Sequence, residues 1–311
     1  MITKAPITGT IWDENINKTV KLIKENEEFL FGASIDPDSV GSMLSLALYL
    51  RILGKRVNLI INGMLGANFD FLVKIISHNK IGVIDSMEKL QKVKSDADVV
   101  MFFDTANSKL MPFYEDIKKI YDARRLPVVE FDHHFGTDSE ELCVESIKLY
   151  RKANANTEII AELLLQLYDE GSGFPHPFSR RNILLSLITG LLGDTVNGKV
   201  VHFKEDYDYW MSCLCENLKK ETHAHKIDIN FTDHYQISEY LHALSEEQEI
   251  CLKYLSERII MDKGFGALNL LNSTYVDVKH CCQPFDSDWF ADVREFLLNM
   301  VPEKSVVFIC A

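Results

Sequence analysis

Long apolar runs are missing from this sequence of 311 residues, and acidic side chains outnumber basic ones. No apolar stretch approaches the roughly 20 residues needed to cross a bilayer, so we expect no membrane as a partner. Residues 1–6 lack the apolar core of a secretory signal. The formal net charge of −13 argues against long duplex DNA, whose capture needs a basic surface. Small phosphorylated substrates stay open, because bound metal ions can reverse the potential locally.

Cysteine is sparse, and its seven positions show no framework spacing. Several cysteines stand inside apolar or helical patterns, namely Cys143, Cys213, Cys251 and Cys310. This distribution predicts reduced thiols and a cytoplasmic location. The run His280-Cys281-Cys282 lacks the Cys-x-x-Cys spacing of a soft-metal site, so we predict that these residues pack in the core or at a buried edge.

Short apolar runs alternate with helical patterns through the first 200 residues. The apolar runs predict strands at 29–33, 57–61, 97–103 and 127–131. Helical patterns occupy 42–50, 69–77, 109–121, 157–167 and 179–191. Strands that are apolar throughout and separated by helices are typical of a parallel sheet covered on both faces. The predicted fold class is therefore α/β, with a parallel sheet flanked by helices.

The pattern changes beyond residue 205. Charged helical stretches at 205–220 and 236–257 precede a strand at 264–270, a helix near 289–300 and a strand at 305–309. We predict a first domain at 1–205, a helical linker at 206–245 and a smaller α/β domain at 246–311. The last domain is expected to be incomplete, because the sequence stops directly after an apolar strand.

Carboxylates stand where the predicted strands end. Asp36 and Asp38 follow the first strand, Asp104 follows the third, and Asp132-His133-His134 follows the fourth. Asp194 comes after an apolar helix. Because the carboxyl ends of parallel strands lie along one edge, we expect these acidic groups and imidazoles to share one crevice.

Like charges packed so closely repel one another unless cations neutralise them. Oxygen ligands with one or two imidazoles suit Mn²⁺ or Mg²⁺. Two such ions about 3.5–4 Å apart can activate a water and stabilise a phosphoryl centre. Gly41-Ser42 at a helix start can offer backbone N–H groups to a phosphate. Arg180-Arg181 and Lys199 are further candidates for phosphate contact, although a solvated arginine pair is the more common role.

Each motif alone has a plainer interpretation. An Asp-x-Asp after a strand is most often a turn with a helix N-cap, and a carboxylate such as Asp104 at a strand end often serves the same purpose. Cys213 and Cys215 stand beside Trp210 in a helical stretch, which favours packing. The occurrence of all the acidic motifs at strand ends, in this order, favours a metal site.

In this order the motifs resemble the DHH phosphoesterase superfamily, over about residues 15–205 and more loosely beyond. That superfamily includes RecJ-type nucleases, oligonucleotide and cyclic-dinucleotide phosphodiesterases, exopolyphosphatases and family II inorganic pyrophosphatases. The resemblance implies two manganese ions, with Mg²⁺ as an alternative, bridged by Asp104. It implies that Asp38, His133 and Asp194 bind one ion, that Asp36 binds the other, and that His134 faces the substrate phosphate. Ser42, at its helix start, is the second residue expected at that phosphate.

The sequence departs from the superfamily in two places. A histidine usually stands four residues before the first Asp of the Asp-x-Asp motif, and that position is Gly32. The ion at Asp36 is therefore expected to bind weakly or to complete its ligands from elsewhere. The Gly-Gly-Gly-His loop of members that cut nucleotides is also absent from the sequence.

The predicted function is a metal-dependent phosphoesterase, which hydrolyses small phosphodiesters through a metal-activated water. Short single-stranded oligonucleotides or cyclic dinucleotides are the first substrates to expect. Two alternatives stay open: hydrolysis of polyphosphate or pyrophosphate, and nucleotide binding by a regulatory protein with weakened catalysis. A homodimer is compatible with the sequence.

Overall fold

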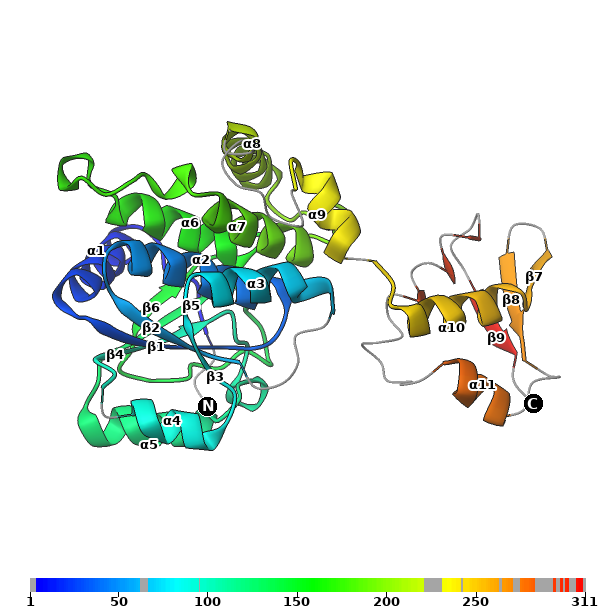
Figure 1. Cartoon of the computed structure of the whole chain (residues 1–311), viewed down its shortest axis with the longest axis horizontal. Coiled ribbons are helices and arrows are strands. Elements are labelled where there is room, and N and C mark those ends of the chain that lie inside the picture. Colours follow the sequence, from blue (N-terminus) through cyan, green and yellow to red (C-terminus); the bar gives the residue numbers. More distant parts are fainter. Residues whose placement is uncertain are drawn as a thin grey trace. The chain divides into compact units, whose positions relative to one another are not determined.

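Figure 1 presents the chain as a computed structural model, which describes residues 4–61, 67–94, 96–220, 231–241, 243–262, 265–270, 275–282, 293–294, 297–298, 300–301 and 306–309. The chain divides into two compact units, Met1–Leu241 and His242–Ala311. Among the described residues, no helix combines the length and the apolar character needed to cross a membrane.

A six-stranded parallel sheet forms the centre of the first unit, in the order β3-β2-β1-β4-β5-β6. The strands are β1 (Glu28–Ala33), β2 (Arg56–Ile60), β3 (Gly82–Ile84), β4 (Val99–Phe103), β5 (Val128–Asp132) and β6 (Ile147–Tyr150). The predicted fold class is confirmed, with the four predicted strands present as β1, β2, β4 and β5. The chain order reverses between β1 and β4, and such switch points are where open α/β sheets bind ligands.

The two faces of the sheet are covered by different helices, because successive strand residues point to opposite sides. Phe29 and Phe31 face one core, and Leu30 between them faces the other. The first core is closed by α1 (Thr10–Glu25), α2 (Pro37–Ile52), α3 (Asp70–His78), α6 (Asn156–Leu167) and α7 (Arg181–Asp194). The second core is closed by α4 (Met87–Val93) and α5 (Tyr114–Arg124), on the opposite side of the sheet in Figure 1.

Helices α2 and α7 are in backbone contact where two glycines meet. A Cβ atom added at Gly41 would lie 2.4 Å from the carbonyl oxygen of Ser186 and 3.0 Å from the amide nitrogen of Gly190. Only a residue without a side chain allows this approach. The crossing brings the start of α2 and the end of α7 close together, and these two ends carry predicted metal ligands.

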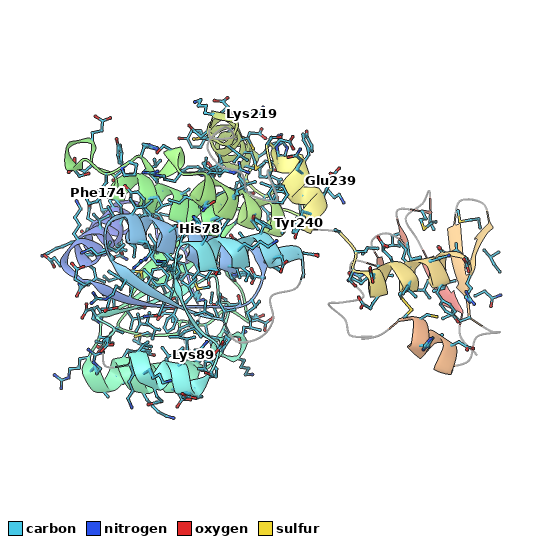
Figure 2. All side chains as sticks on the ribbon, in the orientation of Figure 1. His78, Lys89, Phe174, Lys219, Glu239 and Tyr240 are labelled. Atoms are coloured by element: carbon cyan, nitrogen blue, oxygen red, sulfur yellow. A yellow bond between two sulfur atoms is a disulfide. The ribbon has the colours of Figure 1, made fainter. Side chains whose placement is uncertain are left out.

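Helices α8 (Lys204–Lys220) and α9 (His234–Leu241) complete the first unit, packing against α7. Tyr240, labelled in Figure 2, packs edge-on against Phe71 of α3 and Phe231, with ring centroids 5.6 and 5.5 Å apart. The buried Arg181, one of the candidate phosphate contacts, donates to the carbonyl oxygen of Phe231 at 2.7 Å. Arg181 thus connects α7 to the segment before α9.

Short 3₁₀ turns occupy Ala67–Phe69, Ser108–Leu110, Glu170–Ser172 and Pro177–Ser179. The stretch 236–257, predicted as one helical segment, contains two helices instead, α9 and α10 (Glu246–Ser256). The separation arises because Ser245 starts a new helix with a capping box, in which its side chain and that of Gln248 bond each other's backbone N–H groups.

The second unit contains a three-stranded sheet, β7-β8-β9, and the helices α10 and α11 (Tyr275–Cys281). The strand β8 (Phe265–Asn269) pairs antiparallel with β7 (Ile259–Asp262) and parallel with β9 (Val306–Ile309). The helix predicted near 289–300 falls largely outside the described residues.

The prediction of reduced cysteines is wrong for Cys251 and Cys282, which form a disulfide between α10 and the end of α11, with Cα atoms 4.7 Å apart. The two cysteines are 31 residues apart in the sequence, and only the packing of the two helices brings them together. Four other cysteines among the described residues are free thiols: Cys143, Cys213, Cys215 and Cys281. Cysteine chemistry therefore does not argue for a cytoplasmic location.

Candidate metal centre

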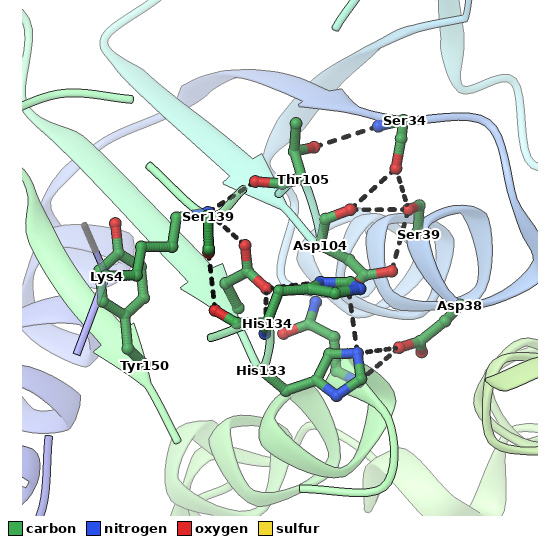
Figure 3. A network of polar contacts seen from close by, with 12 residues as sticks. Lys4, Ser34, Asp38, Ser39, Asp104, Thr105, His133, His134, Ser139 and Tyr150 are labelled. Atoms are coloured by element: carbon green, nitrogen blue, oxygen red, sulfur yellow. Dashed lines mark hydrogen bonds and ion pairs between the residues drawn. The ribbon is translucent and has the colours of Figure 1, made fainter. Parts of the chain in front are cut away.

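Three carboxylates and one imidazole converge at the switch point of the sheet, and Figure 3 shows His133 beside Asp38 and Asp104. The Nε2 atom of His133, just after β5, lies 3.0 Å from Oδ2 of Asp194 and 3.3 Å from Oδ1 of Asp104. It lies 3.6 Å from Oδ2 of Asp38 in the first turn of α2. The strand ends and the α2–α7 crossing thus bring together the four residues that the sequence predicted for one ion.

Two atoms at the middle of this cluster that could bind a metal lack hydrogen bonds within the described part of the chain. His133 Nε2 and Asp104 Oδ1 are buried, and neither has a hydrogen-bond partner among the described residues. The other ring nitrogen of His133 lies 3.2 Å from the carbonyl oxygen of Ala153. A carbonyl can only accept, so Nδ1 carries the proton and Nε2 presents its lone pair in the neutral ring. Among the described residues, His133 belongs to two groups that could hold a metal ion, one with Asp38 and Asp194 and one with Asp104 and His134, and the ligand atoms of each group lie within 4.8 Å of one another.

Helix α6 holds Asp38 in place. The backbone N–H groups of Asn156 and Thr157, in the first turn of α6, donate to the two carboxylate oxygens of Asp38. The N-terminal end of a helix favours an anion, so Asp38 is stabilised as a carboxylate although it is fully buried. The sequence predicted the start of α6 but gave no sign that it would contact Asp38.

Asp104 has a backbone conformation that few residues adopt. Its φ of 44° lies in the left-handed region, where Asp and Asn are tolerated better than other residues with a side chain. Its N–H donates to the carbonyl oxygen of Phe131 at 2.9 Å, which fixes the turn after β4. The turn directs Oδ1 to within 3.3 Å of both His133 Nε2 and His134 Nδ1.

The charges of the cluster shift its pKa values in opposite directions. Burial, followed by the charges of Asp104 and Asp194, raises the pKa of Asp38 well above its ordinary value. Burial alone would lower the pKa of His133, but contacts with Asp104 and Asp194 raise it well above its ordinary value. The carboxylates therefore require positive charge beside them, which a proton on His133 or a metal cation can supply.

His134 is oriented by Asp132, the first residue of the motif. The backbone N–H of His134 donates to Asp132 Oδ1 at 2.7 Å, and its ring Nδ1 lies 2.9 Å from the same oxygen. Contacts with the Asp104 and Asp132 carboxylates raise the pKa of His134 to about 10. Its side chain is 42 % exposed, against 10 % for His133, so His134 is the imidazole that a substrate can reach.

The two remaining candidate site residues are placed differently. Asp36 is the N-cap of α2, with Oδ1 accepting from the Ser39 N–H at 2.8 Å. The Ser42 side chain is fully buried, and its hydroxyl lies 3.4 Å from Asp38 Oδ1. Ser42 thus faces the predicted metal ligand Asp38. Lys199, another candidate for phosphate contact, is exposed in the turn after α7.

A buried lysine that the sequence gave no reason to select lies behind the motif. Lys4 precedes α1, and its ammonium group donates to Asp132 Oδ2 and to the carbonyl oxygen of Thr105 (Figure 3). The side chains of Lys4 and Asp132 are 1 % and 2 % exposed. Lys4 keeps Asp132 charged, and Asp132 orients His134. Lys4 is therefore a positioning residue for the motif.

Replacing Lys4 by Met is expected to destabilise the protein by about 3 kcal/mol, because the buried Asp132 Oδ2 would lose its ion pair and only Oδ1 would keep a partner, His134. Chemical denaturation at neutral pH measures this change. Lys92→Met is the matched control, since Lys92 is exposed and its ion pair with Glu88 contributes about 0–1 kcal/mol. Equal stability of the two variants would show that the Lys4–Asp132 pair does not hold the motif.

Comparison with known proteins identifies the family. The description "DHH family, N-terminal domain" matches residues 29–191, which is more than half of the chain. The chain belongs to the DHH family. The match includes Asp36, Asp38, Asp104 and the Asp132-His133-His134 motif, and it ends three residues before Asp194. A search of curated proteins found no match for this DHH protein.

One solved structure shows the same fold, and two others match with lower scores. An exopolyphosphatase-related protein from Bacteroides fragilis superposes with a TM-score of 0.65 at 19% identity, covering 94% of this chain and 77% of that one. A putative family II inorganic pyrophosphatase from Methanococcus jannaschii matches with a TM-score of 0.46 at 16% identity, covering 90% and 82%. Exonuclease RecJ bound to manganese matches with a TM-score of 0.46 at 13% identity, covering 98% and 82%.

Proposed function

We propose that this DHH protein is a metal-dependent phosphoesterase whose cation is held by Asp38, Asp104, His133 and Asp194. The observation that carries the proposal is the convergence of three carboxylates on the lone pair of His133 Nε2. Three oxygen ligands with a single imidazole suit Mn²⁺, and Mg²⁺ is the alternative. Such an ion supplies a Lewis acid and activates a water molecule.

The residues around the cation would bind and orient the substrate. His134, held by Asp132 and with its pKa raised to about 10, carries a positive charge at neutral pH. A charged imidazole at the exposed side of the cluster is suited to donate to a phosphate oxygen. Asp38 and Asp194, on α2 and α7, would bind the cation on its side away from the substrate.

Small phosphodiesters, such as short single-stranded oligonucleotides or cyclic dinucleotides, are the proposed substrates. The net charge of −13 disfavours long polyanions, and the positive charge of this site is confined to the cation and His134. Polyphosphate or pyrophosphate would use the same ligands and is the alternative substrate class. A nucleotide-binding protein without turnover is the alternative from another class, because Gly32 removes a ligand that the superfamily usually has.

A substrate panel with millimolar Mn²⁺ tests the proposal. The panel contains a linear dinucleotide, a cyclic dinucleotide, tripolyphosphate and pyrophosphate, and the reaction is followed by chromatography and phosphate release. We expect turnover of a dinucleotide by the natural sequence and none by His133→Asn, which removes the nitrogen ligand. Cleavage of pyrophosphate alone would overturn the substrate class. Binding of a nucleotide without turnover of any compound would overturn the proposal that the protein is an enzyme.

A further inference from the structure

The carboxylate oxygens expected to hold a second cation already have hydrogen-bond donors from this chain. Asp36 accepts from the Ser39 N–H at Oδ1, while its Oδ2 lies 2.8 Å from the Ser34 hydroxyl and 2.6 Å from the Ser39 hydroxyl. Both oxygens of Asp36 are therefore satisfied as those of a helix N-cap. Asp104 Oδ1 and His133 Nε2, by contrast, have no hydrogen-bond partner among the described residues.

The hydroxyl of Ser39 lies within hydrogen-bond distance of both carboxylates expected to hold the second cation, and Figure 3 shows its contact with Asp104. It is 2.6 Å from Asp36 Oδ2 and 3.0 Å from Asp104 Oδ2. The Ser34 hydroxyl lies 2.6 Å from that of Ser39 and 2.8 Å from the carbonyl oxygen of Asp104. The two hydroxyl protons suffice for one hydrogen bond to each carboxylate. A cation that bridged the same oxygens would have to displace the Ser39 side chain, which is fully buried.

The space around Gly32 is tightly packed, which leaves little room for a replacement ligand. A Cβ atom at Gly32 would lie 3.1 Å from Met111 Sδ and 3.3 Å from Phe102 Cδ1. Both neighbours belong to the core that α4 and α5 cover. A larger side chain at this position would start among apolar atoms, so the glycine is explained by packing against Met111.

We propose that this protein is a mononuclear member of its family, in which the Ser34 and Ser39 hydroxyls take the place of the second cation between Asp36 and Asp104. The inference rests on the proposed function only in that both assume the cation bound by Asp38, Asp104, His133 and Asp194. Hydroxyl groups supply hydrogen bonds to the two carboxylates but no positive charge. The site would then act with one cation, bound by Asp38, Asp104, His133 and Asp194.

Metal counting on the full chain tests this inference without any assay of turnover. The protein is loaded with Mn²⁺, desalted and measured by elemental analysis and electron paramagnetic resonance. We expect one Mn²⁺ per chain, with the six-line spectrum of an isolated ion. Two ions per chain, with the spectrum of a coupled pair, would overturn the proposal.

The variant Asp36→Asn further distinguishes a site with one cation from a site with two. Asn is as good an N-cap as Asp, so α2 keeps its start. In the mononuclear arrangement Asp36 is linked to Asp104 through the Ser34 and Ser39 hydroxyls and not through a cation. The variant is therefore expected to keep one Mn²⁺, bound at most about tenfold more weakly. A fall from two ions to one would show that Asp36 is a ligand and overturn the proposal.

Gly32→His gives an independent result. The two hydroxyls and Met111 remain in this variant, so the stoichiometry is expected to stay at one Mn²⁺ per chain. A rise to two ions would mean that the missing histidine alone prevents the second site, and the role of the serines would be refuted. Failure of the two proposals can be distinguished. One bound ion without turnover of the panel contradicts the proposed function, and two bound ions with turnover contradict this inference.

Discussion

Replacing Asp104 by Asn is expected to abolish Mn²⁺ binding and to lower turnover at least about a thousandfold, which corresponds to about 4 kcal/mol of activation barrier. Asp104 Oδ1 is a buried oxygen without a hydrogen bond among the described residues, and it faces the ligand nitrogen of His133. Asn removes the charge but keeps the shape. It also tolerates the left-handed backbone at this position, whereas Ala would add about 1 kcal/mol of strain.

Thermal unfolding with and without Mn²⁺ distinguishes loss of the metal site from loss of the fold. Without metal, Asp104→Asn is expected to be less stable than the natural protein, because, against the effect of burial, contacts with His133 and His134 lower the pKa of Asp104 and stabilise its carboxylate. Mn²⁺ at about 100 times its Kd should stabilise the natural protein by about 2.7 kcal/mol and leave the variant unchanged. An equal Mn²⁺-dependent shift in the variant would show that Asp104 is not a ligand.

Replacing Gly41 by Ala is expected to destabilise the protein by about 2 kcal/mol and to weaken Mn²⁺ binding at least about tenfold. Ala normally favours a helix interior by about 1 kcal/mol over Gly, so the substitution would be stabilising without the contact to α7. Here the new methyl group would meet the backbone of Ser186 and Gly190, which cannot rotate away. The two helices must separate, and they carry Asp38 and Asp194.

Chemical denaturation and calorimetric titration with Mn²⁺ measure the two effects of Gly41→Ala. Gly171→Ala is the control, because Gly171 is exposed and its new methyl group would make only an ordinary contact of 3.4 Å with Asp169. That variant should stay within about 0.5 kcal/mol of the natural protein. Unchanged Mn²⁺ affinity in a destabilised Gly41→Ala would show that the crossing does not position the ligands.

Most of the site could be predicted because its residues follow strands. Asp104 and His133 stand directly after apolar runs, and parallel strands bring their carboxyl ends to one edge. Asp194 was harder to place, since it ends a helix, and only the α2–α7 crossing brings it to His133. The sequence order of the motifs supplied that link through the family resemblance.

The supporting residues could not be predicted because nothing local marks them. Lys4 is 128 residues from its partner Asp132, and Asn156 is 118 residues from Asp38. The serines 34 and 39 are ordinary residues for a turn and a helix start, and their contact with Asp104 depends on the pairing of β1 with β4.

The elements missed in the fold were short, or their patterns carried no distinctive signal. The edge strands β3 and β6 have 3 and 4 residues, too few to show a pattern of alternation. Helix α1 has a clear apolar face, with Trp12, Ile16 and Ile23 buried, but it stands before the first recognised strand. The disulfide of the second unit depends on a contact between α10 and α11 that neither sequence spacing nor composition reveals.

Diffraction from crystals grown with Mn²⁺, recorded at the manganese absorption edge, tests the metal centre most directly. We expect an anomalous peak bonded to His133 Nε2 and to carboxylate oxygens of Asp38, Asp104 and Asp194. A peak held by His134 instead of His133, or no peak between these four side chains, would contradict the proposed metal centre.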